Sequence, residues 1–254
     1  MNKQLVIMPC LDMMNGRVVK GVNFVNIKDA GDPVECCRAY CAAGADEIAM
    51  LDITATVQGR ATMLDVVRRV AEVKTVPFTM GGGINSVSAA EEVLKAGADK
   101  ISTSSAAFRK PELIAEMIKE FGADRVTVAI DVAQSGAMPS GYEVFIDGGR
   151  TATGVDALEW ARRVNDFGVK CILPTSKSTD GARTGFDLPL IRMIRGITDA
   201  DVVASGGAGT MQHFADAAAA GANVLLGASV FHFNIIAIPE LKKFLKGAGF
   251  EVRD

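Results

Sequence analysis

Two aspartates, Asp12 and Asp131, each end an apolar run of the sequence, in MPCLD and in TVAID. A carboxylate in such a position can exchange a proton with a bound substrate, and two of them can act as general acid and general base. Unequal surroundings would have to separate their pKa values. Either aspartate alone has a simpler interpretation as a helix cap or turn residue, because aspartate favours both positions. As a pair, they favour acid–base chemistry.

Two glycine-rich segments, 81–84 (GGGI) and 204–209 (ASGGAG), also follow apolar runs. Glycines let backbone amides approach an anion closely, and serines at neighbouring strand ends add donors. Turn glycines are common, so one segment alone would be weak evidence for binding. Two similar segments predict two phosphate sites and a substrate with a phosphate at each end. The residues expected there are Gly83, Ser104, Ser105, Gly207, Ala228 and Ser229.

Three further polar residues lie beside these positions. Asp180, in STDG, is expected to hold a substrate hydroxyl or a loop conformation, and Asp52, in LDITA, to orient its neighbours. Cys10 lies two residues before Asp12 and therefore on the same face of a strand. Since no histidine is close to it in sequence, Cys10 is interpreted as a small buried residue rather than a nucleophile.

The elements that must position these residues are short apolar runs separated by helical patterns. The runs are 5–11, 47–53, 77–83, 100–104, 126–131, 171–176, 202–207 and 224–229. They are continuous rather than alternating, as in parallel strands buried on both faces. Eight strand–helix units predict an α/β fold, a (β/α)8 TIM barrel, in a single domain over residues 1–254, with a doubly wound open sheet as the alternative. Pro9 and Pro174 fall inside two of the strands, which suggests a local bulge.

An internal repeat supports the barrel. AGADKISTSSAAF begins at residue 96 and AGANVLLGASVF at residue 220, and the same offset of 124 pairs Gly83 with Gly207. The third and fourth strands thus recur as the seventh and eighth, which predicts two half-barrels related by a pseudo-twofold axis. The first and fifth strands of such a barrel lie opposite each other. Asp12 and Asp131 are therefore expected to face each other across its mouth.

Composition excludes several classes of partner. Hydrophobic residues make up 49% and charged residues 22%, with a net charge of −3 and no basic stripe, so neither disorder nor nucleic-acid binding is indicated. Five cysteines without C-x-x-C spacing and two histidines favour a reducing cytoplasm and indicate no disulfide framework, metal site or cofactor. The uncharged segment 217–239 is interrupted by polar residues, so it is interpreted as a helix end, a buried strand and a loop rather than a membrane span.

Motifs along nearly the whole chain resemble the cyclase subunits of imidazole glycerol phosphate synthase, from histidine biosynthesis. These motifs are CLDMMNGRVVKGVNF (10–24), DAGDPVE (29–35), LDITAT (51–56), GGGI (81–84), AIDV (129–132), GARTGFD (181–187), ASGGAG (204–209) and ASVFHF (228–233). The resemblance implies that ammonia from a glutaminase subunit, docked on the N-terminal face in a heterodimer, passes through the barrel. It would attack the ribulosyl carbonyl of a bisphosphorylated aminoimidazole carboxamide nucleotide. The products would be imidazole glycerol phosphate and aminoimidazole carboxamide ribonucleotide.

The same resemblance assigns roles residue by residue. It implies that Asp12 is the acid and Asp131 the base, and that Lys20 is a loop lysine that closes over substrate. The implied substrate and phosphate contacts are Gly83, Ser105, Asp180, Gly181, Gly207, Ala228 and Ser229. At the ammonia entrance, Glu47 and Lys100 match two of four charged residues typical of the family.

Four positions depart from the family's pattern. Ser104 stands where asparagine is usual and Ser178 where an aspartate is usual, which alters the reach of both side chains. At the entrance, Val6 and Cys171 replace the other two charged residues and leave a two-charge gate. Three alternatives therefore stay open: the sister aldose-to-ketose isomerase of the same pathway, an ammonia-passing barrel that serves another amidotransferase, and a phosphate-binding module without catalysis.

Overall fold

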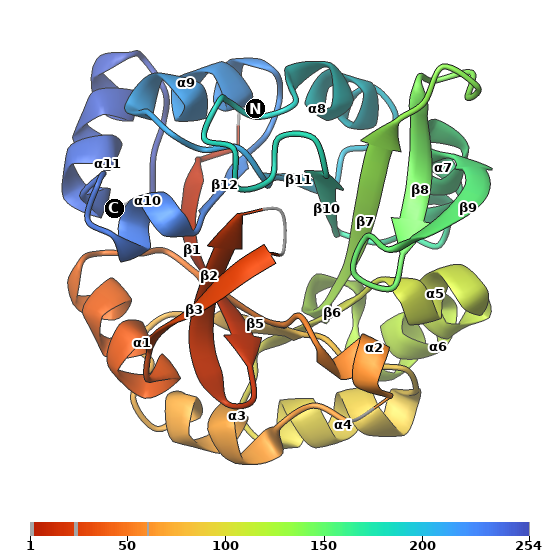
Figure 1. The fold of residues 1–254 in the computed structure, drawn as a ribbon, viewed down its shortest axis with the longest axis horizontal. Helices are drawn as coiled ribbons and strands as arrows, with labels where there is room; N and C mark the ends of the chain where they lie inside the picture. Colours follow the sequence, from red (N-terminus) through yellow and green to blue (C-terminus); the bar gives the residue numbers. More distant parts are fainter. Residues whose placement is uncertain (1–2, 23–24, 60, 254) are drawn as a thin grey trace.

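The computed structural model describes residues 3–22, 25–59 and 61–253, and within them the chain forms a closed barrel of eight parallel strands (Figure 1). In the order of the barrel, its strands are β1 (Val6–Met14), β4 (Ile48–Asp52), β5 (Phe78–Gly81), β6 (Lys100–Thr103), β7 (Val126–Gln134), β10 (Cys171–Ser176), β11 (Asp201–Ala204) and β12 (Val224–Gly227). Pairing of β12 with β1 and of β7 with β10 closes the ring. The predicted TIM barrel is confirmed.

Helices surround the strands on the outside (Figure 1). The longer ones are α1 (Pro33–Ala42), α3 (Leu64–Ala71), α4 (Val87–Lys95), α6 (Glu112–Phe121), α7 (Ala157–Asp166), α8 (Leu188–Arg195), α9 (Met211–Ala219) and α11 (Ile238–Gly247). Short helices α2 (Ala55–Gln58), α5 (Ser105–Arg109) and α10 (Ser229–His232) follow β4, β6 and β12, and a 3-10 turn, η1 (Ala123–Arg125), precedes β7. Among the described residues, no helix is both long and apolar enough to cross a membrane.

The strands are apolar on both faces because each face meets a different core. Along β1, Val6, Met8 and Cys10 belong to a cluster that also draws on β4, β10, β11 and β12 and fills the barrel interior. Ile7 and Leu11, on the opposite face, belong to the larger core between the barrel and its helices. A strand with period-two side chains therefore reads as a continuous apolar run.

Pro174 interrupts a ladder without shifting it. The register between β10 and β7 continues from Cys171 to Ser176 through the proline. On the other side, pairing of β10 with β11 stops at Ile172 and returns only as a bridge between Thr175 and Ser205. The bulge suggested by the sequence is therefore wrong here, because the missing amide appears as a gap in the ladder. Pro9 lies where the pairing of β1 passes from β12 to β4.

Two antiparallel hairpins, which the strand pattern did not predict, extend the barrel strands that carry the two aspartates. β2 (Arg17–Val22) and β3 (Val25–Gly31) follow β1, and β8 (Tyr142–Ile146) and β9 (Thr151–Asp156) follow β7. Both hairpins contain register shifts. Because they stand on the C-terminal side of opposite strands, they form part of the surroundings of the barrel mouth (Figure 1).

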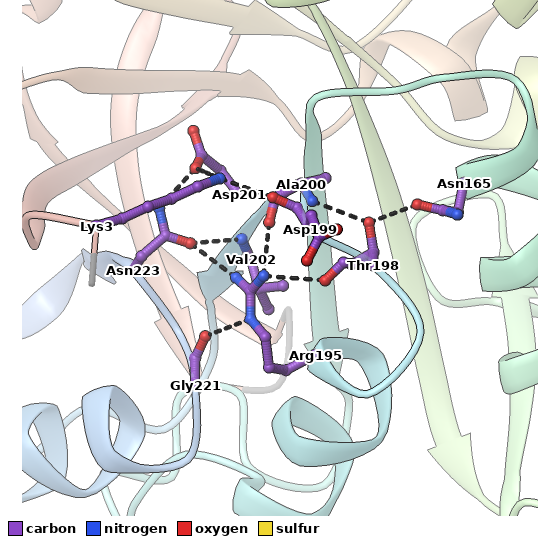
Figure 2. A network of polar contacts seen from close by, with 10 residues as sticks. All are labelled: Lys3, Asn165, Arg195, Thr198, Asp199, Ala200, Asp201, Val202, Gly221 and Asn223. Carbon is purple, nitrogen blue, oxygen red and sulfur yellow. Dashed lines mark hydrogen bonds and ion pairs between the residues drawn. The ribbon is translucent and has the colours of Figure 1, made fainter. Parts of the chain in front are cut away.

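A polar network holds the N-terminal ends of β11 and β12 beside α8 (Figure 2). The Arg195 guanidinium donates to the carbonyl oxygens of Gly221, Thr198 and Ala200 at 2.8 to 3.0 Å. Asn223 accepts from Arg195 at 2.9 Å and donates to Asp201 at 2.7 Å, and Lys3 donates to the same carboxylate at 2.8 Å. These bonds satisfy carbonyl groups at the end of the barrel and fix the position of Asp201.

Candidate active site

A cavity with a volume of about 560 Å³ lies at the C-terminal ends of the barrel strands. Its lining includes the predicted residues Asp12, Gly83, Ser104, Ser105, Asp131, Asp180, Gly181, Gly207, Ala228 and Ser229. The fold thus brings together side chains from positions 12 to 229 at the end of the barrel where such enzymes bind substrates. The side chain of Lys20, also predicted here, lies outside the described part of the structure.

Asp12 and Asp131 lie on β1 and β7, which are opposite strands of the ring. The Cys10 thiol donates to a carboxylate oxygen of Asp12, with sulfur and oxygen 3.4 Å apart. This contact confirms that Cys10 shares the strand face of Asp12. Both aspartates line the cavity, so a substrate that fills it has a carboxylate on each side.

The surroundings of Asp131 make it suitable as a base near neutral pH. Burial, the largest cause, and repulsion from Asp180 raise the pKa of its carboxyl, attraction to Lys177 lowers it, and the net result is a pKa of about 6. Burial raises the pKa because an ionised carboxylate loses hydration inside the cavity. A base whose pKa lies near the working pH is both deprotonated and able to accept a proton.

The first cradle comprises Gly82, Gly83, Ser104 and Ser105, which follow β5 and β6. Gly82 and Gly83 have φ angles of 95° and 74°, and a Cβ on Gly82 would overlap the Asp52 carbonyl oxygen. The Gly82 carbonyl accepts a hydrogen bond from Thr62 Oγ1 at 2.7 Å. Only glycine combines this backbone conformation with so close a neighbour. The turn therefore keeps its amide groups at the cavity wall.

The second cradle comprises Gly206, Gly207, Ala228 and Ser229, which follow β11 and β12. Gly206 and Gly207 have φ angles of 79° and 111°. The Gly207 carbonyl accepts from the Gly185 amide at 2.8 Å, and a Cβ on Gly207 would overlap the Gly185 carbonyl oxygen. The two cradles are thus built from the same kind of strained glycine turn beside a serine-bearing strand end.

Asp52 orients its own loop, as expected from the sequence. One of its carboxylate oxygens accepts from the Thr54 amide, the Thr54 hydroxyl and the Ala55 amide at 3.1 to 3.2 Å. Ser178 forms a hydrogen bond with Ser176 at 3.0 Å between their hydroxyl oxygens. Its short side chain is thereby turned to its own strand end.

At the other end of the barrel, Glu47 and Lys100 form an ion pair with nitrogen and oxygen 2.7 Å apart. Both line a small cavity that also contains Cys171. Two further charged residues near this position, Asp201 and Arg253, were not predicted from the sequence. Asp201 also lines the small cavity, and Arg253 lies 3.5 Å from a Glu47 oxygen. The sequence signal for Asp201 is its position directly before the apolar run 202–207. The signal for Arg253 is only that it is a basic residue near the C-terminus.

Four basic residues in or near the active-site cavity were not predicted from the sequence. Arg109, Lys110 and Arg183 line the cavity, and Lys177 acts on the pKa of Asp131. All four lie within a few residues of predicted positions, and this proximity is the sequence signal for them. Across the described residues, no group of three or more histidine, cysteine, aspartate or glutamate side chains is placed to hold a metal ion.

Comparison with known proteins gives a consistent family. The pattern of the family described as histidine biosynthesis protein matches residues 6–237. The chain is 52% identical over 249 residues to imidazole glycerol phosphate synthase subunit HisF of Salinispora tropica, covering 97% of this chain and 98% of the relative. It is 51% identical over 249 residues to that of Salinispora arenicola, with the same coverage. It is 49% identical over 251 residues to that of Corynebacterium glutamicum, covering 97% of both chains.

Proposed function

The chain belongs to the histidine biosynthesis protein family as a relative of imidazole glycerol phosphate synthase subunit HisF, and we propose that it is the ammonia-dependent cyclase of that enzyme. We place it in the lyase class, acting as one domain over residues 1–254. Its substrate would be the bisphosphorylated phosphoribulosyl-formimino-aminoimidazole carboxamide ribonucleotide. The observation that carries this proposal is a pair of opposed carboxylates, Asp12 and Asp131, in a cavity with two glycine-rich cradles.

In this proposal the two phosphates of the substrate occupy the two cradles, so the ribulosyl carbonyl lies between the aspartates. Ammonia attacks that carbonyl, Asp131 accepts a proton that the attacking nitrogen gives up, and Asp12 supplies a proton to the oxygen. The raised pKa of Asp131, about 6, supports its role as the base. The protonated oxygen leaves as water, and the new nitrogen attacks the formimino carbon, which closes the imidazole ring. The bond from that carbon to the amine of the second nucleotide breaks, and the products are imidazole glycerol phosphate, aminoimidazole carboxamide ribonucleotide and water.

We further propose a glutaminase subunit as the partner that supplies ammonia at the N-terminal end. The small cavity lined by Glu47, Lys100 and Cys171 lies in the barrel interior on that side. The Glu47–Lys100 pair supports a polar entrance there, because both side chains line the cavity and lie within 2.7 Å of each other. The name of the relatives, a subunit, supports assembly with another chain.

The test is turnover of the bisphosphate substrate by purified protein with ammonium as the nitrogen source. We expect the imidazole product from the wild type and almost none from Asp131→Asn. The matched control is Asp124→Asn, which changes an exposed aspartate in η1, just before the same strand. Full activity of Asp131→Asn would remove Asp131 from the role of base.

The same assay separates the alternatives. Conversion of the nucleotide without ammonia would instead indicate the sister isomerase. Failure to bind the substrate, with both cradles intact, would indicate an ammonia-passing barrel for another acceptor, which the changed residues Val6, Cys171, Ser104 and Ser178 keep open.

A further inference from the structure

The loop after β10 brings an arginine to the second cradle. Arg183 has a φ of 59°, an uncommon conformation for a residue with a side chain. Its carbonyl lies against Gly209, where a Cβ would overlap the carbonyl oxygen, and the Gly185 amide donates to the Gly207 carbonyl at 2.8 Å. The two loops are therefore tightly packed, and the backbone of Arg183 is held beside the cavity that its side chain lines.

The Arg183 side chain points to the serine of that cradle. Its Nε lies 3.3 Å from Ser229 Oγ, and its guanidinium carbon lies 5.9 Å from the centre of the exposed Phe233 ring. Among the described residues, Arg183 forms no ion pair with a carboxylate. The contact with Ser229 uses only Nε, so the two terminal nitrogens of the guanidinium are left for an anion.

Arg109, the arginine beside the first cradle, is paired with a carboxylate. Arg109, at the end of α5, donates to both carboxylate oxygens of Asp147 at 2.8 Å. Asp147 also donates its amide to Ser105 Oγ at 2.8 Å, and Arg109 holds the pKa of the Asp147 carboxyl below its usual range. Of the described cationic side chains that line the cavity, Arg109 and Lys110 are thus each paired with a carboxylate of the protein, whereas Arg183 is not.

We propose that Arg183 binds the phosphate monoester in the second cradle, so that this end of the substrate is held by a guanidinium and the other end by amides and hydroxyls. This inference rests on the proposed function for the identity of the substrate. A guanidinium fork matches two phosphate oxygens and keeps its charge at any working pH. The second cradle should therefore bind its phosphate more tightly and with greater dependence on salt.

The experiment compares Arg183→Met with a double variant that removes the Arg109–Asp147 pair as a neutral unit, Arg109→Met with Asp147→Asn. Asparagine tolerates the φ of 58° at position 147. We expect KM for the bisphosphate to rise roughly tenfold in Arg183→Met, as for loss of one charge-assisted contact, with kcat changed less than about twofold. The double variant should change KM less than about twofold, and Arg183→Lys should recover part of the loss.

Each product carries one phosphate, so product inhibition tests the assignment to one cradle. Arg183→Met should weaken inhibition by one product roughly tenfold and leave the other nearly unchanged, and added salt should weaken binding more in the wild type than in the variant. Equal loss for both products, or a KM within twofold of the wild type, would overturn the inference. Calorimetric titration with inorganic phosphate is independent of turnover. If the wild type binds phosphate at two sites but does not convert the bisphosphate, and Arg183→Met has lost one of those two sites, the proposed function is wrong and the role of Arg183 in phosphate binding is supported.

Discussion

The two halves of the barrel share one scaffold but surround their carboxylates differently. At an offset of 124 residues, α1 corresponds to α7 and α4 to α9, and the N-caps Asp32 and Ser86 correspond to Asp156 and Thr210. The aspartates do not keep this offset, since Asp131 follows Asp12 by 119 residues. The segment from Asp131 to its helix cap is thus five residues longer than that from Asp12, and the hairpin β8–β9 lies within it.

This difference indicates that the repeat sets the positions of the strand ends, whereas the loops provide the charged residues around them. Asp131 has Asp180 and Lys177 as charged neighbours, whereas Asp12 is contacted by the Cys10 thiol. One cradle has its arginine matched by Asp147, and the other has Arg183 directed at its serine. A symmetric framework can therefore bind a substrate whose two ends differ, because each half adds its own charged residues to equivalent strand ends.

The largest expected effect tests what the halves share, the glycine turns. Gly82→Ala and Gly207→Ala should each lower the free energy of unfolding by on the order of 3 kcal/mol, since a Cβ would overlap a backbone carbonyl in a left-handed conformation. Gly154→Ala is the matched control, with a φ of 72° and open space around it, and should cost about 1 kcal/mol. Chemical denaturation measures all three. Similar losses at Gly82 and Gly154 would show that the turn relaxes and that the close approach is unimportant.

A second effect concerns what the halves do not share, the raised pKa of Asp131. Its folded pKa of about 6 exceeds the unfolded value of 3.8, so the folded state binds the proton more tightly. Wild-type stability therefore falls as pH rises from about 4 to 6, and above that range ionised Asp131 costs up to about 3 kcal/mol. Asp131→Asn should be more stable than the wild type at pH 8, with the difference vanishing near pH 4. Thermal unfolding of both proteins across this range is the measurement.

The pH dependence of activity gives an internal control for the same residue. The acidic limb of kcat/KM should lie near pH 6, because Asp131 must be deprotonated to act as base. Lys177→Met removes the attraction and should move the limb to higher pH, whereas Asp180→Asn removes the repulsion and should move it to lower pH. Shifts in the same direction in the two variants would mean that another group sets the limb.

The sequence predicted the features that depend on local pattern. Apolar runs located the barrel strands to within a few residues. The cavity residues were predictable because strand ends of a parallel barrel meet at one face. Glu47 and Lys100 were expected at the N-terminal end from the family resemblance alone, and the ion pair between them was not predicted.

The remaining features depend on which residues meet across long separations. Arg109 and Asp147 pair across 38 residues, and Arg183 and Ser229 meet across 46. No periodicity encodes these contacts, because they are set by the conformations of loops. The hairpins were missed because their strands are not continuous apolar runs: side chains along β8 alternate between buried and half-buried, and those of β9 are mostly exposed or half-buried.

The smallest expected effect compares two equivalent caps, Asp32 of α1 and Asp156 of α7. Each carboxylate accepts from two amides of the first helical turn. Asp156 also accepts from the Ser140 amide at 2.7 Å, which joins the helix to the chain before β8, whereas Asp32 contacts the exposed Arg69 at 3.1 Å. Asp32→Ala should cost about 1 kcal/mol, as expected for loss of a cap, and Asp156→Ala about 2 kcal/mol, because it also leaves the Ser140 amide without its acceptor.

Chemical denaturation of the two variants, with Asp32→Asn and Asp156→Asn as controls that keep a capping oxygen, separates the cap from the added contact. We expect the asparagine variants to recover most of the loss at position 32 and less at position 156, where one carboxylate bonds to the helix through Oδ1 and to Ser140 through Oδ2. An asparagine side chain offers only one acceptor oxygen, so it cannot serve both. Equal recovery at the two positions would mean that the link to Ser140 adds nothing to stability and that the halves differ only around the active site.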